Sequence, residues 1–223
     1  IKREVFYLIG RYMLGNPDCQ QYVDWAVSLL QRGIENENII ILAGLDRARW
    51  EEKQEYFEKV LEDLSILVPN GFDDVMELFF ETLIWKIRSG EFEAIEALDL
   101  VCDIGYSHDD ENYRQFIYLS EDLDLLDEGY SFSTNITKDN IDECILCEFK
   151  LWLKAKEKGI NDIARLAYCQ KCGHIAKPEL KIKKNFFSSV NQYCCTECNS
   201  TSLLYACDQA VRIKIIENWE IDK

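Results

Sequence analysis

The sequence predicts a mainly α protein, either a helical bundle or an array of helical hairpins, followed by a small β-rich module. Apolar residues recur at helical spacing through most of the first 160 of the 223 residues. Two C-x2-C pairs follow, Cys169 with Cys172 and Cys195 with Cys198. This spacing is typical of a zinc ribbon. We therefore expect an acidic helical domain over 1–160 and a zinc-ribbon domain over 161–223.

Four helices are predicted before the turn at 69–71. The first two should pack as a hairpin, and Gly33 ends the second where a left-handed residue is favoured. The third, over 36–45, is apolar almost all round and should be short and buried, with a strand as the alternative. The fourth follows Asp46 and has one charged face. The residues expected on the buried faces are Val5, Leu8, Ile9, Tyr12, Val23, Ala26, Val27, Leu30, Trp50, Phe57, Val60, Leu61 and Leu64.

Further helices are predicted from 72 to 160. One begins at Phe72 and ends at Ser89–Gly90, and the next runs from Glu91 to about Ile104 with carboxylates in its first turns, which suits the helix dipole. Leucines alternating with carboxylates predict a helix near 121–128. The last begins at Thr137 and ends at Gly159, with an apolar stripe at Ile141, Ile145, Phe149 and Trp152.

Short strands are predicted in the C-terminal module. We expect strands over 164–168 and 180–187, the second because apolar residues alternate with lysine. The segment 202–216 is compatible with a strand pair or a helix. Alternation of Val or Ile with Arg or Lys favours a strand over 211–216.

The paired cysteines predict a structural zinc site bound by Cys169, Cys172, Cys195 and Cys198. A turn with two intervening residues lets both sulfurs of a pair face one ion. Four thiolates leave no coordination position for a catalytic water, so the metal should stabilise the fold. Cys194 is the alternative to Cys195, and His174 is a neighbour rather than a ligand. Cys144 and Cys147 lie on a predicted helix, where core packing is favoured over metal binding.

The charge is strongly asymmetric along the chain. The formal net charge is −16, and residues 1–140 contain 30 acidic and 12 basic side chains, whereas 141–223 contain 11 and 13. An acidic body repels nucleic acid and attracts a basic protein. The alternative is an acidic surface that serves solubility alone.

Residues 108–130 are dense in carboxylates. A hydrolytic metal site at His108 is disfavoured because His174 is the only other histidine. We expect instead a solvated surface that binds a basic partner. Its residues are Asp109, Asp110, Glu111, Glu121, Asp122, Asp124, Asp127 and Glu128.

The sequence indicates a non-enzymatic protein. It contains no nucleophile elbow, phosphate loop or dinucleotide fingerprint. The apolar run near the start is interrupted by Gly10 and Arg11, so it predicts neither a signal peptide nor a membrane span. The paired cysteines suit a reducing compartment, and we expect a cytoplasmic protein.

Two segments, 39–46 (IIILAGLD) and 85–101 (WKIRSGEFEAIEALDLV), resemble small helical domains of bacterial proteins, some of them similar to immunity proteins that neutralise toxins. The resemblance covers about 5–120, leaves the zinc ribbon outside it and transfers no catalytic motif. It implies an inhibitor that binds a basic toxin. The alternative is a zinc-ribbon protein that binds nucleic acid or acts as a regulator. The basic and aromatic residues for nucleic-acid binding would be Lys177, Lys181, Lys183, Lys184, Phe186 and Phe187.

Overall fold

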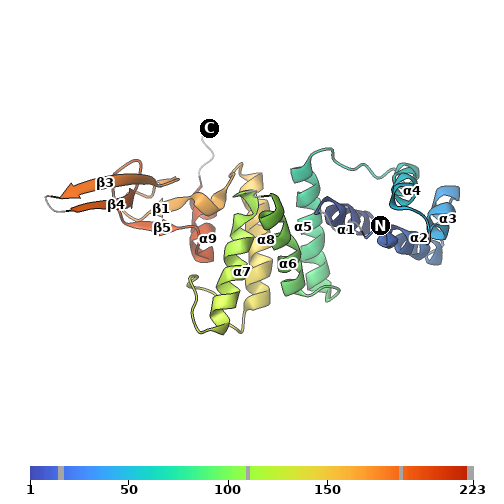
Figure 1. Ribbon diagram of the computed structural model, residues 1–223, viewed down its shortest axis with the longest axis horizontal. Coiled ribbons are helices and arrows are strands. Elements are labelled where there is room, and N and C mark those ends of the chain that lie inside the picture. The colour runs from blue at the N-terminus through green and yellow to red at the C-terminus, as the bar shows by residue number, and fades with distance from the viewer. Residues whose placement is uncertain (15–17, 109–110, 186–187, 220–223) are drawn as a thin grey trace. The chain divides into compact units, whose positions relative to one another are not determined.

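The computed structural model describes residues 1–14, 18–108, 111–185 and 188–219, with backbone alone at 104–108, 111, 183–185 and 188–190 (Figure 1). The chain forms two compact units, Ile1–Lys86 and Ile87–Lys223. The boundary between them falls near the end of helix α5 (Phe72–Ser89). The domain boundary expected at 160/161 lies inside the second unit, so the helices before it and the strands after it belong to one compact body.

The first unit is helical throughout its regular structure. It contains α1 (Lys2–Met13), α2 (Gln20–Gln31), α3 (Glu37–Gly44), α4 (Trp50–Asp63) and most of α5 (Phe72–Ser89). α2 packs on α3 and α4, and α1 packs on α2. Asn36 caps α3 by accepting a hydrogen bond from the amide of Ile39, as its place before an apolar run indicates.

Aromatic rings and close backbone approach organise the core of this unit. Tyr22 of α2 stacks on Phe57 of α4 with ring centroids 4.1 Å apart. Gly10 of α1 lies against the ring of Phe79 in α5, and a Cβ at Gly10 would overlap that ring. The helices therefore meet closely at a position that only glycine can occupy without a shift of the ring.

The buried faces differ in places from those predicted. In α2 the buried set includes Tyr22, Trp25 and Leu29, while Val27 is exposed. Trp25 is accommodated because its indole nitrogen donates to Glu4 at 3.1 Å. Trp50, expected in the core, is the first residue of α4 and is exposed.

The second unit joins helices to two small antiparallel sheets. Its α helices are α6 (Ala94–His108), α7 (Arg114–Asp127), α8 (Ile141–Glu157) and α9 (Gln209–Asn218), and α6, α7 and α8 pack on one another. Single 3-10 turns lie at Glu111–Tyr113 and Ile163–Arg165. The second of these turns occupies the first two residues of the strand predicted over 164–168, and the strand observed there is β1 (Ala167–Cys169).

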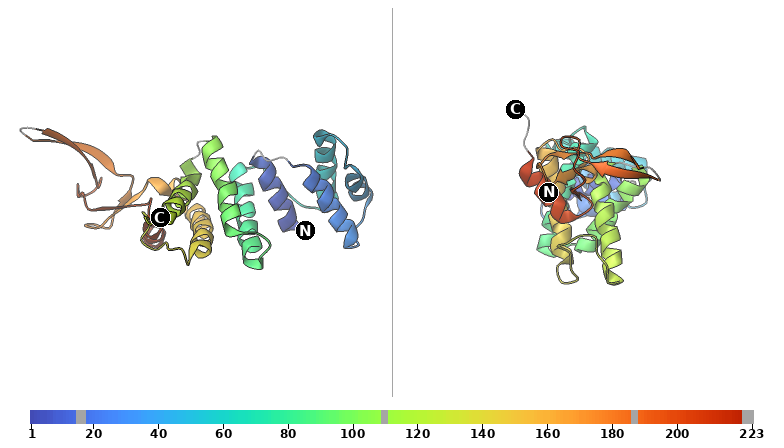
Figure 2. Two further views of the ribbon diagram at one scale, coloured as in Figure 1. Left: turned by 60° about the horizontal axis from the view of Figure 1, so that its bottom comes forward. Right: turned by 90° about the vertical axis from the view of Figure 1, so that its left-hand side faces the viewer.

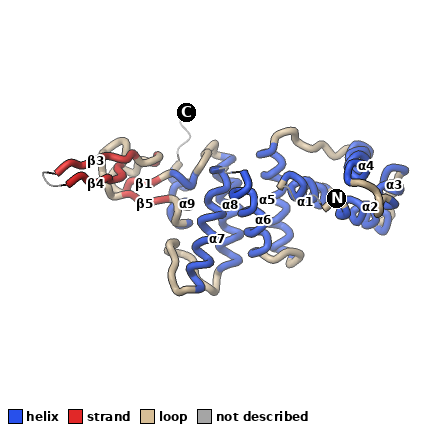
Figure 3. The backbone as a smooth tube through the Cα atoms, in the orientation of Figure 1, coloured by secondary structure: helices blue, strands red, loops and turns tan. Residues whose placement is uncertain are grey.

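The described strands all lie in the C-terminal part of the chain (Figure 3). β2 (Ile175–Ala176), β1 and β5 (Leu203–Tyr205) form one sheet in the order β2-β1-β5. β3 (Glu179–Asn185) and β4 (Ser188–Cys194) form a separate hairpin with Glu179 opposite Cys194. This hairpin extends away from the helices of its own unit (Figure 2).

The strand predicted over 211–216 is wrong, because this segment belongs to helix α9. Asp208 caps the helix by accepting from the amide of Ala210 at 2.8 Å. Val211, Ile215 and Ile216 pack with Leu151 and other apolar residues of α8. Arg212 is also buried, so the apparent alternation of apolar and basic residues did not reflect alternating burial.

Among the described residues, none of the helices combines the length and apolar character that a membrane crossing needs.

Candidate metal centre

Two turns of the same geometry present the four cysteines. Cys169 ends β1 and Cys195 follows β4. In the first turn the carbonyl of Cys169 accepts from the amide of Gly173 at 2.8 Å, and the amide of Cys169 donates to the carbonyl of His174 at 3.0 Å. In the second turn the carbonyl of Cys195 accepts from the amide of Asn199 at 3.0 Å, and the amide of Cys195 donates to the carbonyl of Ser200 at 2.8 Å.

Both turns use a left-handed residue just after the second cysteine. Gly173 has φ of 76° and Asn199 has φ of 56°. These are residue types that adopt this conformation at low cost. The residues after each C-x2-C pair therefore fold the chain back so that the two sulfurs of each pair face the same point.

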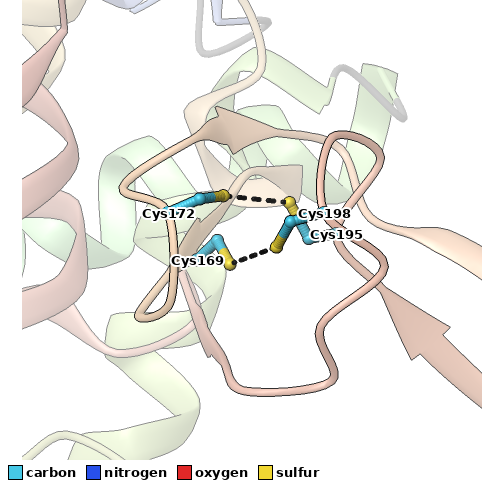
Figure 4. A group of neighbouring side chains, drawn as sticks. All are labelled: Cys169, Cys172, Cys195 and Cys198. Carbon is cyan, nitrogen blue, oxygen red and sulfur yellow. Dashed lines mark hydrogen bonds between the residues drawn. The ribbon is translucent and has the colours of Figure 1, made fainter.

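The four sulfurs are spaced as a tetrahedral metal site requires (Figure 4). The Sγ atoms of Cys169 and Cys198 are 3.6 Å apart, and those of Cys172 and Cys195 are 3.7 Å apart. All four lie within 4.8 Å of one another. Four thiolates at the usual zinc–sulfur bond length would be about 3.8 Å apart. Within the part of the chain that the structure describes, no other group of His, Cys, Asp or Glu is gathered in this way.

The pKa values of Cys169 and Cys172 move in opposite directions. Burial opposes ionisation of Cys169, but the backbone amides of Cys172 and Lys171 bond its sulfur and the pKa falls to about 6. For Cys172, the amide of His174 favours the thiolate, yet the neighbouring sulfurs outweigh it and the pKa rises to about 12. Crowded sulfurs cannot all be anions unless a cation lies among them, and this is the condition that a divalent metal satisfies.

The donor set suits a structural metal. Cys169 and Cys195 are buried, Cys198 is half-buried and Cys172 is exposed. Four sulfur ligands fill a tetrahedral shell and leave no place for a reacting water. The site would connect β1 with the segment after β4, two regions that the small sheets alone hold weakly.

The other cysteines considered lie outside this cluster. Cys194 ends β4, and its buried thiol donates to the carbonyl of Gln192 at 3.7 Å. Cys144 is buried in α8, where its thiol donates to the carbonyl of Asn135. Burial raises the pKa of the Cys144 thiol to about 11, which suits a core residue rather than a reactive one. His174 contributes its backbone, not its ring, to the first turn.

The expected partner-binding carboxylates divide into different environments. Asp109 and Asp110 lie outside the described residues, and nothing is described of the Glu111 side chain. Four of the others are exposed on α7 or just after it: Glu121, Asp124, Asp127 and Glu128.

The expectation that Asp122 is solvated is wrong. Its side chain is only 1% exposed. Its two carboxylate oxygens accept hydrogen bonds from the amides of Phe132 and Ser133, at 2.6 and 2.9 Å. Asp122 therefore holds a loop in place rather than presenting charge to a partner.

An acidic pocket of about 760 Å³ lies between the C-terminal half of α7 and the start of α8. It contains two of the expected carboxylates, Asp124 and Asp127. Sequence reasoning missed the other three, Asp139, Asp142 and Glu143. The sequence did contain a signal for them, because acidic residues before and in the first turn of a helix suit the helix dipole. When two consecutive helices pack together, such residues at the start of the second lie near the end of the first. Among the described residues of the lining, Lys138 is the one basic side chain, and it pairs with Asp127 at 3.0 Å.

Comparison with protein-family models, curated proteins and solved structures found no match to the chain. No family is therefore identified, and the comparisons lend no support to the resemblance to immunity proteins.

Proposed function

We propose that the protein is a non-enzymatic inhibitor that binds a basic protein through an acidic surface of its second unit. The observation that carries the proposal is the acidic pocket, whose described lining brings five carboxylates from α7 and from the start of α8 and the residues just before it together with a single lysine. The formal net charge of −16 means that the whole chain, like the pocket, attracts positively charged partners. Lysine or arginine side chains of a partner are the groups that such a pocket would receive.

The pocket is suited to a partner that arrives through long-range attraction. Its carboxylates Asp124, Asp142 and Glu143 are exposed, so they keep their hydration until binding and steer encounter. The pair between Asp127 and Lys138 is also largely exposed, and such pairs contribute about 0 to 1 kcal/mol. An incoming guanidinium group could replace Lys138 at little cost.

The finer form of the proposal is an immunity protein that neutralises a basic toxin. It rests on this charge complementarity and on the loose pattern in 39–46 and 85–101. In the same proposal, the four-cysteine cluster binds one structural zinc ion, for which the sulfur spacing is the support. The zinc supplies folding free energy to the C-terminal sheets and takes no part in a reaction.

The charge mechanism is tested with a partner recovered by co-purification from the native host. Asp124→Asn, Asp142→Asn and Glu143→Gln together remove three charges from the pocket. A matched control removes three exposed charges from the first unit, through Glu51→Gln, Glu52→Gln and Glu62→Gln. We expect the pocket variant to associate at least tenfold more slowly and to lose much of its salt dependence. Equal association rates and equal salt slopes for the two variants would contradict the proposal.

Nucleic-acid binding is the second candidate function, and the β3–β4 hairpin favours it. Leu180, Ile182 and Tyr193 are exposed there, and Leu180 stands opposite Tyr193 across the strands. An exposed aromatic beside lysines is suited to base stacking. Lys181, however, bonds Glu179 and Asn199 within the module. Tyr193→Ser should abolish binding to single-stranded RNA or DNA if this function is the correct one, and the pocket variant should not.

A further inference from the structure

The loop between α7 and α8 displays two aromatic side chains to solvent. Tyr130 is 70% exposed and Phe132 is 69% exposed, more than any other aromatic side chain that the structure describes. The ion pair of Asp127 and Lys138 closes the two ends of the loop. Compact loops with closed ends are frequent binding elements. In Figure 1 this loop joins the lower ends of α7 and α8.

Buried polar groups hold the loop in one conformation. The carboxylate of Asp122 accepts from the amides of Phe132 and Ser133. The hydroxyl of Ser133 is bonded by the amide of Gln209 at 3.3 Å, and the hydroxyl of Ser131 donates to the carbonyl of Ser133 at 2.8 Å. Asp122 of α7 and Gln209 of α9 therefore fix the backbone beside Phe132.

This arrangement is unusual for an ordinary surface turn. Ser133 is buried and its amide bonds the carboxylate of Asp122, while the neighbouring rings of Tyr130 and Phe132 are directed to water. A fixed loop with exposed rings loses little conformational freedom on binding, which favours affinity. Exposed aromatic residues are also the residue type most enriched at the centres of protein interfaces.

The charge around the loop indicates the kind of partner. Asp127 and Glu128 precede the rings and Asp139 follows them, with Lys138 already paired. Asp127, Lys138 and Asp139 also line the acidic pocket, so the ends of the loop and the pocket share residues. A basic protein with an exposed apolar side chain beside its lysines or arginines matches both features. Aromatic faces add a further attraction for such cations.

We propose that Tyr130 and Phe132 are the apolar anchors of the surface that binds the basic partner, with Asp122 as the residue that positions them. This inference rests on the proposed function and adds a residue-level requirement to it. The partner's binding segment then carries an apolar side chain next to lysine or arginine. Charge brings the two proteins together, and burial of the rings holds the complex.

The test uses the metal-loaded full chain and a phage-displayed library of random dodecapeptides as the probe. We expect enriched peptides to combine lysine or arginine with an aromatic or aliphatic residue. Affinities of the synthesised peptides are then measured by fluorescence anisotropy. Tyr130→Ser with Phe132→Ser should weaken binding by about tenfold or more, as loss of interface anchors does. Trp50→Ser is the matched control, since it removes an exposed ring from the first unit and should change nothing.

The positioning role of Asp122 is tested by comparing two substitutions on α7. Asp122→Asn and Glu121→Gln remove one charge each from neighbouring sites, but only Asp122 is buried and bonded to the loop. We expect Asp122→Asn to speed amide exchange at 132 and 133 and to weaken peptide binding several-fold. Glu121→Gln should leave both unchanged. Equal effects of the two substitutions would exclude a positioning role.

The outcomes separate this inference from the proposed function. Basic peptides that depend on Asp124 and Asp142 but not on the rings would overturn the inference and leave the charge mechanism standing. Peptides that depend on the rings but not on charge would overturn the proposed function. Absence of peptides that depend on either feature would overturn both. Circular dichroism and metal content of each variant establish that the fold is retained.

Discussion

Cys195, not its neighbour Cys194, has the position that a metal ligand needs in the second turn. Its carbonyl and amide make the same two hydrogen bonds that Cys169 makes in the first turn. Cys194 is still in β4, where adjacent side chains point to opposite faces of the strand. A shift of one residue therefore directs the sulfur away from the cluster, and the thiol of Cys194 bonds Gln192 instead.

We predict that Cys172→Ser and Cys194→Ser differ sharply in metal content. Cys172→Ser removes one of the four sulfurs, so bound zinc should fall from one ion per chain to a small fraction of that value. Cys194→Ser should retain the ion. Metal analysis of freshly purified protein provides the measurement. Loss of zinc from Cys194→Ser together with retention in Cys172→Ser would show that a different set of sulfurs binds the metal.

The residues of the cluster could be predicted from the sequence because a C-x2-C pair specifies its own turn. Asp122 could not be predicted from its charge, because its environment depends on a loop that begins several residues later. Helical spacing did carry a signal. Gln115, Leu119 and Asp122 recur at i, i+4 and i+7, and all three are buried.

At the scale of elements, α9 is attached to α8 by a buried ion pair. Arg212 bonds both carboxylate oxygens of Glu148, at 2.9 and 2.7 Å, and neither side chain is exposed to solvent. Gln209 bonds the same carboxylate at 2.8 Å. Arg212 also donates to the carbonyls of Ala206 and Cys207, which lie between β5 and α9. This side chain thus orients the chain as it leaves the sheet.

We predict that Arg212→Met lowers the free energy of unfolding of the second unit by about 3 to 5 kcal/mol, because it leaves Glu148 charged and unpaired in the core. The double variant Arg212→Met with Glu148→Leu should recover much of this loss, since no buried charge remains. Urea unfolding followed by circular dichroism measures both. Equal destabilisation by the single and double variants would show that packing, not the unpaired charge, sets the cost.

The helices were predictable as elements because their apolar spacing extends over several turns. α9 was not predictable, because Arg212, which is buried, falls where an alternating strand would place an exposed polar residue. Only the partner of Arg212, Glu148, reveals that the position faces inward, and 64 residues separate the two in sequence. The start of β1 was also predicted too early. The 3-10 turn at Ile163–Arg165 precedes it and is too short to produce a periodic sequence pattern.

At the scale of the whole molecule, the C-terminal sheets share one compact unit with α8 and α9. The chain leaves α8, forms the two cysteine turns and returns as α9 to pack on α8 again. Leu151, Ile160, Val211 and Ile215 share one apolar cluster across this return. The composition change near residue 160 coincides with a change from helices to short strands inside the second unit.

Removal of the metal should therefore affect the second unit unevenly and leave the first unaffected. A four-thiolate zinc site contributes on the order of 10 kcal/mol to the fold it closes, comparable with the whole stability of a small domain. The three short strands β1, β2 and β5 have little apolar burial to replace it. We expect a chelator to abolish amide protection in these strands and both cysteine turns, while α8 and α9 keep part of theirs through their own cluster and ion pair.

Hydrogen–deuterium exchange read by mass spectrometry resolves these regions separately. α2, α3 and α4 serve as the internal control, because they belong to the first unit and contribute no residue to the metal cluster. Acid should act as the chelator does, because protons compete with the metal for thiolate, so protection should be lost as the pH falls and return as it rises with zinc present. Unchanged exchange in the cysteine turns after the metal is removed would show that the sheets fold without it, and the metal would then have no structural role.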